Sequence, residues 1–259
     1  MNILLVGDIV GSPGRNIFKQ LVPRLKSSGE VHTVIANAEN AAAGNGITLP
    51  LAQELFDAGA DAITLGDHVW GQKEFAPLAG SDKRIIRPAN LPPGTPGNGT
   101  AVIHTNYGDI GIISLLGRVF MNPCDCPFRA ADQALKSLPA NIPIIVDIHA
   151  EATSEKIALG HYLDGRVAAL FGTHTHVQTN DAQLLPGGTA YISDVGMTGP
   201  SHSVIGREID PVLKKFLTGM PSRFEVASGP TRLDAALLVL DNQTRKPLSI
   251  SPVRWSLPN

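Results

Sequence analysis

The 259-residue sequence is poor in cysteine and has no long apolar run. Only Cys124 and Cys126 are present, too few for a four-cysteine zinc site, and a disulfide between them would close a strained ring. No apolar segment approaches the ~20 residues that a membrane helix requires. The N-terminus reaches Asp8 after a short apolar segment without a basic region, unlike a signal peptide. We therefore expect two reduced thiols, no membrane association and a cytoplasmic protein.

Clusters of positive charge are also absent. The 21 Lys and Arg residues are balanced by 23 Asp and Glu residues, which gives a formal net charge of −2. Neutralising the phosphates of a long nucleic acid needs clustered cations, so association with RNA is not supported by charge. The sequence contains no G-x-G-x-x-G, G-x-x-x-x-G-K-[ST] or G-x-S-x-G motif. These absences argue against a Rossmann site, a P-loop and an α/β-hydrolase nucleophile.

The residues that are present indicate a globular α/β protein. Apolar residues make up 43% of the chain, and 26 Gly and 20 Pro indicate many loops. We expect a single domain over residues 1–259. Short apolar strands alternate with helices in the first part of the chain, which predicts a largely parallel sheet covered on both faces. The expected strands are Ile3–Val6, Thr33–Ala36 and Ala62–Leu65, and the expected helices are Arg15–Lys26 and Leu51–Ala58.

The remainder of the chain predicts further strands. A hairpin is expected from Ala101–His104 and Ile110–Leu115, followed by apolar strands at Ile142–Ile148 and Val167–Phe171. The C-terminal third is rich in turns, and we expect its short strands in a second, mixed or antiparallel sheet. These strands are Ala190–Ile192, Arg223–Val226, Ala235–Leu240 and Leu248–Ile250.

Polar side chains follow five of the predicted strands. In chain order they are Asp8; Asn37, Glu39 and Asn40; Asp67 and His68; His149; and His174 with His176. The carboxyl ends of parallel strands share one edge of a sheet, and ligands bind in the crevice there. We therefore expect these side chains to line one site.

This set of side chains suits a metal centre. Carboxylate and imidazole groups together favour Fe, Mn, Zn or Co. The six candidate ligands are Asp8, Glu39, Asp67, His149, His174 and His176, which is more than one tetrahedral ion uses. A carboxylate can bridge two ions about 3.5–4 Å apart, and such a pair activates water and clamps a phosphoryl group. His68 is then a spare imidazole that could protonate a leaving alkoxide.

Each of these residues also has a simpler interpretation. An aspartate after a strand often forms a turn, and a histidine in an apolar strand is often structural. Five coincidences at equivalent strand ends are harder to explain, so the pattern as a whole favours a site. The other histidines lack such partners, and we expect them to be structural or exposed: His32, His104, His161 and His202.

Five short motifs resemble the YmdB-like branch of the calcineurin-type metallophosphoesterases, and Asp194–Pro200 is similar to another segment of that family. The motifs are Gly7-Asp8-Ile9-Val10-Gly11, Asn37-Ala38-Glu39-Asn40, Gly66-Asp67-His68-Val69-Trp70, Asp147-Ile148-His149-Ala150-Glu151 and Gly172-Thr173-His174-Thr175-His176. They occur in family order between Asp8 and about Pro200, so the resemblance covers most of the chain.

The resemblance implies a four-layer α/β/β/α sandwich, the calcineurin-like metallophosphoesterase fold. It also implies a phosphodiesterase that acts on 2′,3′-cyclic nucleotides and uses two metal ions, foremost iron, then manganese, with zinc less favoured. Homo-oligomers are common in the family, so the resemblance also implies a homo-oligomer. By position, Asp8, Glu39 and His176 would hold one metal ion, while Glu39 would bridge to a second held by Asp67, His149 and His174. Asn40 would orient the phosphate, and His68 would be the catalytic acid.

The sequence departs from the wider pattern in two places. Asp8 is not followed by the D-x-H histidine of the superfamily, a feature that the YmdB-like branch shares. More unusually, Asp67 stands where the family usually has asparagine. We expect this extra carboxylate to tighten metal binding and to make the attacking water less acidic, because it neutralises more positive charge.

Two other functions stay open. A phosphomonoesterase would differ mainly in the walls of its pocket, for which the segments Arg118–Arg129 and Asp194–Ser203 are candidates. A regulatory protein that binds metal or nucleotide with little turnover is the alternative from a different class. Loss of activity in His68→Ala would separate hydrolysis from such binding.

Overall fold

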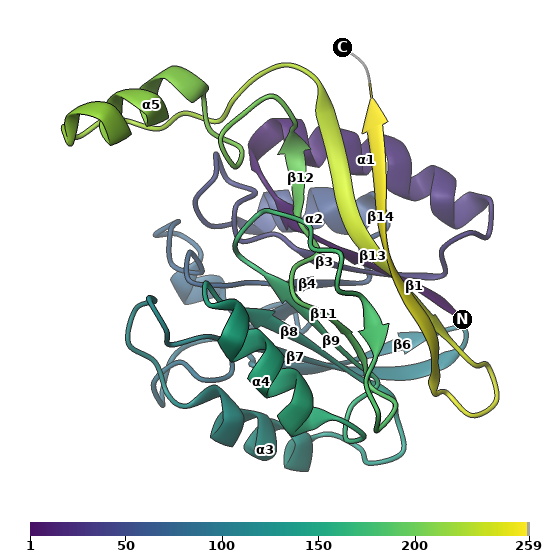
Figure 1. Cartoon of the computed structure of the whole chain (residues 1–259). Helices are drawn as coiled ribbons and strands as arrows, with labels where there is room; N and C mark the ends of the chain where they lie inside the picture. Colours follow the sequence, from purple (N-terminus) through teal and green to yellow (C-terminus); the bar gives the residue numbers. More distant parts are fainter. Residues whose placement is uncertain (258–259) are drawn as a thin grey trace.

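In the computed structural model, which describes residues 1–257, two β-sheets pack face to face and helices cover their outer faces (Figure 1). The first sheet has the strand order β2-β12-β13-β1-β3-β4-β5, with β14 added beside β13. Its strands are β1 (Asn2–Val6), β2 (Asp8–Ile9), β3 (Thr33–Asn37), β4 (Ala62–Thr64), β5 (Ile85–Ile86), β12 (Met197–Pro200), β13 (Thr231–Leu240) and β14 (Pro247–Leu257).

The second sheet has the order β10-β11-β9-β8-β7-β6. Its strands are β6 (Thr100–Thr105), β7 (Gly108–Leu116), β8 (Ile144–His149), β9 (Ala169–Thr173), β10 (Gln183–Leu184) and β11 (Ala190–Ile192). The antiparallel β6–β7 pair confirms the predicted hairpin, and β7, β8, β9 and β11 run parallel.

Three apolar clusters fill the three gaps between four layers. Along β1, Leu4 and Val6 pack toward α1 (Gly11–Ser27) and α2 (Leu49–Asp57), whereas Ile3 and Leu5 belong to the cluster between the sheets. The third cluster lies between the second sheet and α3 (Pro127–Ser137) and α4 (Thr153–Leu163). The α/β/β/α sandwich is therefore confirmed, and each sheet has helices on only one face because its other face meets the second sheet.

The C-terminal strands correct one expectation. β13 and β14 join the first sheet, not the second, and β13 pairs antiparallel with β1 so that Leu4 lies opposite Leu237. This placement covers the edge of β1 and buries its backbone. The predicted strand Arg223–Val226 is wrong, since only an isolated bridge between Val226 and Arg207 occurs there.

Helix α2 begins where local chemistry favours it. Thr48 accepts a hydrogen bond from the Leu51 amide, and a proline lies in the first turn of α2.

Helix α1 begins four residues earlier than predicted. Helices α3, α4 and α5 (Ile209–Thr218) were not predicted, and α5 projects from the body of the molecule (Figure 1). None of the helices within residues 1–257 could span a membrane. Cys124 and Cys126 are free thiols, as predicted.

Candidate metal centre

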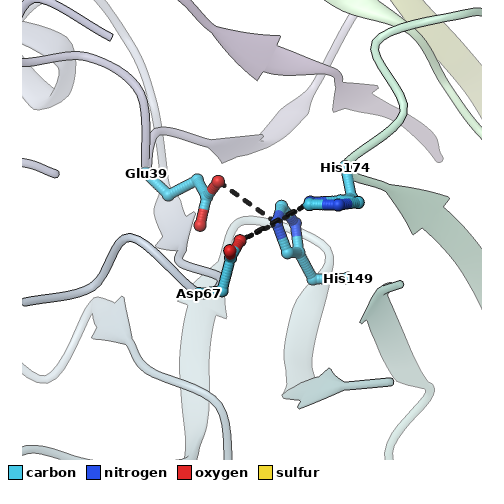
Figure 2. A group of neighbouring side chains, drawn as sticks. All are labelled: Glu39, Asp67, His149 and His174. Carbon is cyan, nitrogen blue, oxygen red and sulfur yellow. Dashed lines mark hydrogen bonds and ion pairs between the residues drawn. The ribbon is translucent and has the colours of Figure 1, made fainter. Parts of the chain in front are cut away.

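The carboxyl ends of strands from both sheets bring the predicted ligands together. Glu39 follows β3 and Asp67 follows β4 in the first sheet, whereas His149 ends β8 and His174 follows β9 in the second. One donor atom from each of these four side chains lies within 4.8 Å of the other three. Figure 2 shows them converging from their separate segments.

The imidazole of His149 lies at the centre of this group. Its Nε2 atom is 3.1 Å from Glu39 Oε1 and 3.1 Å from Asp67 Oδ1. The Nδ1 atom of His174 lies 3.0 Å from the same nitrogen. His149 is fully buried, so its position is set by the protein interior. These contacts place Asp67 among the candidate ligands, as the sequence predicted.

A second group adjoins the first through Glu39. His176 Nε2 is 3.6 Å from Asp8 Oδ1. The Asn40 side-chain nitrogen lies 3.3 Å from His176 Nε2 and 3.1 Å from Glu39 Oε1. The same nitrogen lies 3.4 Å from Asp8 Oδ1, so the Asn40 amide links the pair formed by Asp8 and His176 to Glu39 of the first group.

His68 borders these groups without joining the ligand cluster around His149. Its backbone N–H donates to Glu39 Oε2 at 2.9 Å, and its Nδ1 lies 3.0 Å from Asn40 Oδ1. The side-chain contact between His68 Nδ1 and Glu39 Oε1, at 3.2 Å, raises the pKa of His68 above its ordinary value, although burial opposes this shift. The side chain is 40% exposed, so it remains accessible from the pocket that it lines.

The loop that carries His174 and His176 has an unusual backbone. Their φ angles are +98° and +64°, in a region that non-glycine residues rarely adopt. Asp8 holds the first of them by accepting a hydrogen bond from the His174 N–H at 3.0 Å. Asp194 Oδ2 accepts from both the N–H and the hydroxyl of Thr175 and pairs with the buried Lys156 at 2.8 Å. The strain is thus balanced by buried polar contacts, as is common at functional sites.

Neighbouring groups fix the orientation of each imidazole, and sequence reasoning assigned none of them. His149 Nδ1 lies 2.8 Å from the Thr173 hydroxyl, which donates to buried Asp147 at 2.7 Å. Burial raises the pKa of Asp147 to about 6. His174 Nε2 lies 3.2 Å from Glu151. Such partners hold a metal-binding ring in one tautomer. The alternating spacing of Asp147, His149 and Glu151 was the signal that could have revealed two of them.

The charge balance of the cluster fits bound cations. Asp8, Glu39 and Asp67 lie close together, and within residues 1–257 no lysine or arginine forms an ion pair with them. Buried anions need a compensating charge, and oxygen and imidazole donors suit borderline metals.

A cavity of about 320 Å³ opens beside the cluster. Besides the polar residues of the centre it is lined by Ile205, Arg207 and Phe224. Neither Arg118–Arg129 nor Asp194–Ser203 lines it, so those two candidates for the pocket wall were wrong. Asp194, in the second segment, supports the loop of His174 and His176 through Thr175 without facing the cavity.

The remaining histidines agree with the prediction of structural or exposed roles. His104, His161 and His202 are exposed. His32 is partly buried, and its Nδ1 accepts a hydrogen bond from the Asn2 N–H at 2.9 Å.

The two-sheet sandwich with carboxylates and imidazoles at its strand ends is the calcineurin-like metallophosphoesterase fold. Within this class, the profile of the family described as YmdB-like protein matches residues 4–253, and the chain belongs to that family.

Individual relatives agree with this assignment. The chain is 47% identical over 254 residues to the 2′,3′-cyclic-nucleotide 2′-phosphodiesterase of Bacillus subtilis, covering 98% of this chain and 96% of the relative. It is similar to the crystal structure of a hypothetical protein from Thermus thermophilus, with a TM-score of 0.94, 44% identity and 100% of both chains covered. A phosphatase from Mycoplasma pneumoniae has a TM-score of 0.92 and 36% identity, with 99% of this chain and 93% of that one covered.

Proposed function

We propose that this protein is a metal-dependent phosphodiesterase that hydrolyses 2′,3′-cyclic nucleotides. One observation carries the proposal: three carboxylates and three imidazoles converge from both sheets with no lysine or arginine paired to the carboxylates among residues 1–257. The identity of 47% with the Bacillus subtilis phosphodiesterase supports this substrate class. Iron is the metal we favour, followed by manganese, with zinc less favoured, since all three accept this donor set.

The proposed ligands divide between two ions. Asp8, Glu39 and His176 would hold one, and Glu39 would also contribute to the second. The other ligands of that second ion would be Asp67, His149 and His174. When bound, such a pair of ions acidifies water and neutralises charge on the phosphoryl oxygens.

The protein supplies orientation and the proton. The Asn40 amide, which lies beside both ligand groups, donates a hydrogen bond to a phosphoryl oxygen. Water attacks phosphorus and gives up one proton to solvent, the bond from phosphorus to the leaving oxygen breaks, and His68 gives that oxygen a proton that solvent later restores. Histidine changes its charge near neutral pH, and His68 lines the cavity, so its imidazolium can supply this proton.

A phosphomonoesterase is the second candidate, since one similar structure is that of a Mycoplasma pneumoniae phosphatase. Ile205 and Phe224 could contact the nucleoside of a monoester or of a cyclic diester equally well. The name of the Bacillus subtilis relative, a 2′,3′-cyclic-nucleotide 2′-phosphodiesterase, favours the diester. A regulatory protein that binds metal or nucleotide would retain its binding in His68→Ala.

Elemental analysis combined with turnover tests the proposal. Wild type, Asp8→Ala and His149→Ala would be assayed with bis-p-nitrophenyl phosphate and 2′,3′-cyclic AMP, with His104→Ala as a control at an exposed histidine. We expect two metal ions per chain in wild type and in His104→Ala, and loss of both metal and turnover in the other two variants. Absence of metal after anaerobic purification and reconstitution with Mn or Fe would contradict the metal centre. Metal without turnover would favour the binding role.

A further inference from the structure

One wall of the cavity has no part in metal binding. It consists of Ile205, Arg207 and Phe224, which we call the pocket wall. All three belong to the segment 201–226, which leaves β12, contains the projecting helix α5 and returns to β13 (Figure 1). Hydrolysis of a phosphoester by the metal centre and His68 gives no reason for an aromatic ring at this position.

The pocket wall is attached directly to the metal centre. The Ile205 carbonyl accepts a hydrogen bond from His176 Nδ1 at 2.9 Å, leaving Nε2 of that ring free to face Asp8. This contact fixes the distance between the wall and one proposed metal ligand. A group held against the wall would therefore have a defined position relative to the phosphoryl group.

Arg207 ties the wall to the loop that follows Glu39 and Asn40. Its guanidinium donates to the carbonyls of Ala43, Gly44 and Phe224. Gly44 has a φ of +80°, and a Cβ atom there would lie 2.6 Å from the guanidinium carbon, so this residue makes room for the arginine. Arg207 thus holds the backbone of Phe224 in place beside the loop that follows Asn40.

The ring of Phe224 is itself positioned for contact. It is partly buried in the wall of the cavity, and Lys215 Nζ from α5 lies 5.0 Å from its centroid. An aromatic ring in a largely polar pocket provides a surface for a flat apolar group. Nucleobases stack on aromatic side chains, and the strength of this stacking depends little on which base is present.

We propose that Phe224, together with Ile205, forms the subsite that packs against the nucleobase of the substrate, with Arg207 as a positioning residue. The inference rests on the proposed function and deepens it by assigning recognition of the nucleoside to residues outside the metal centre. It predicts little discrimination among the bases, because stacking does not read hydrogen-bonding edges.

The test compares a cyclic phosphodiester that carries a nucleoside with one that lacks it. The two substrates are 2′,3′-cyclic AMP and ethylene phosphate, which share the five-membered cyclic diester. We expect Phe224→Ala to lower kcat/KM for the nucleotide about tenfold through KM, and to leave ethylene phosphate within about twofold. Phe224→Trp should retain nucleotide activity. If ethylene phosphate turns over too slowly, its inhibition constant serves for the same comparison.

Phe216→Ala is the matched control, since this phenylalanine is 80% exposed on α5 and does not line the cavity. Arg207→Lys should raise KM for the nucleotide without changing metal content or kcat. Equal losses of Phe224→Ala on both substrates would overturn the subsite, because the ring would then be supporting the metal centre. No loss on the nucleotide would overturn it too. Wild-type protein that hydrolyses neither compound would instead contradict the proposed function itself.

Discussion

The floor and the wall of the pocket are built in different ways. The floor consists of the metal-centre residues at the strand ends, where Asp8 and His149 have no exposed surface. The wall comes from the segment 201–226, whose helix α5 leaves Phe216 80% and Leu217 83% exposed. The floor is held by the registers of two sheets, whereas the wall is joined to it by a few hydrogen bonds.

This contrast separates chemistry from recognition. Phosphoryl transfer needs donor atoms placed within fractions of an ångström, and packed sheet ends can provide such precision. Recognition of an organic group tolerates more variation, so it can be located on a peripheral segment. Substitutions in the floor should therefore have the largest effects and substitutions on the outer face of the wall segment the smallest.

Among substitutions that leave the proposed metal ligands in place, the largest effect is expected at the edge of the floor. His68→Ala should lower kcat for 2′,3′-cyclic AMP by about 10²–10⁴-fold, because the leaving alkoxide loses its proton donor. With bis-p-nitrophenyl phosphate the loss should be much smaller, since p-nitrophenolate leaves without protonation. Steady-state kinetics on both substrates, with metal content measured in parallel, checks this. Equal losses on the two substrates would show that His68 is not the general acid.

The next largest effect is expected at the buried ion pair of Lys156 and Asp194, which lies beneath the floor. Asp194→Asn should lower the free energy of unfolding by about 3–5 kcal/mol, because it leaves Lys156 buried without its counter-charge. Denaturant titration measures the change. The double variant with Lys156→Met should regain part of the loss. If the single variant is as stable as wild type, the ion pair does not hold the loop of His174 and His176.

A subtler change concerns Asp67 in the floor. Asp67→Asn should weaken metal binding about tenfold or more, as expected when a charged ligand becomes neutral. It should also move the acidic limb of the pH–rate profile to lower pH, because the site then retains more positive charge and the attacking water ionises more easily. Metal titration and a pH–rate profile measure the two effects. An acidic limb that stays in place would refute the explanation.

The smallest effect is expected on the outer face of the wall segment. Leu217→Ser replaces a side chain that is 83% exposed and does not line the cavity. Turnover should stay within about twofold, and the free energy of unfolding should change by less than about 0.5 kcal/mol. Kinetics and thermal unfolding test this. A large loss of turnover would contradict the claim that the outer face of the wall segment contributes little to catalysis.

The sequence by itself determined most of the metal centre. An apolar run followed by Asp8, Glu39, Asp67, His149 or His174 is a local pattern, and the carboxyl ends of parallel strands meet at one edge within a sheet. The sequence predicted a single such edge, whereas the strands divide between two sheets, and the packing of one sheet on the other joins their two edges. The structure brings Glu39, Asp67, His149 and His174 together. The predicted four layers followed from the resemblance, and strand alternation alone indicated helices on both faces of one sheet.

Only the tertiary structure decided how distant segments pair. The position of β13 beside β1 depends on contacts between residues more than 200 positions apart, which no local pattern encodes. Ile205, Arg207 and Phe224 could not be predicted as pocket residues from the sequence. They do not follow a strand that ends at the site, and they form no recognisable motif. Their relation to the site exists only because folding brings the segment 201–226 over the strand ends and lets Arg207 reach the carbonyl of Gly44.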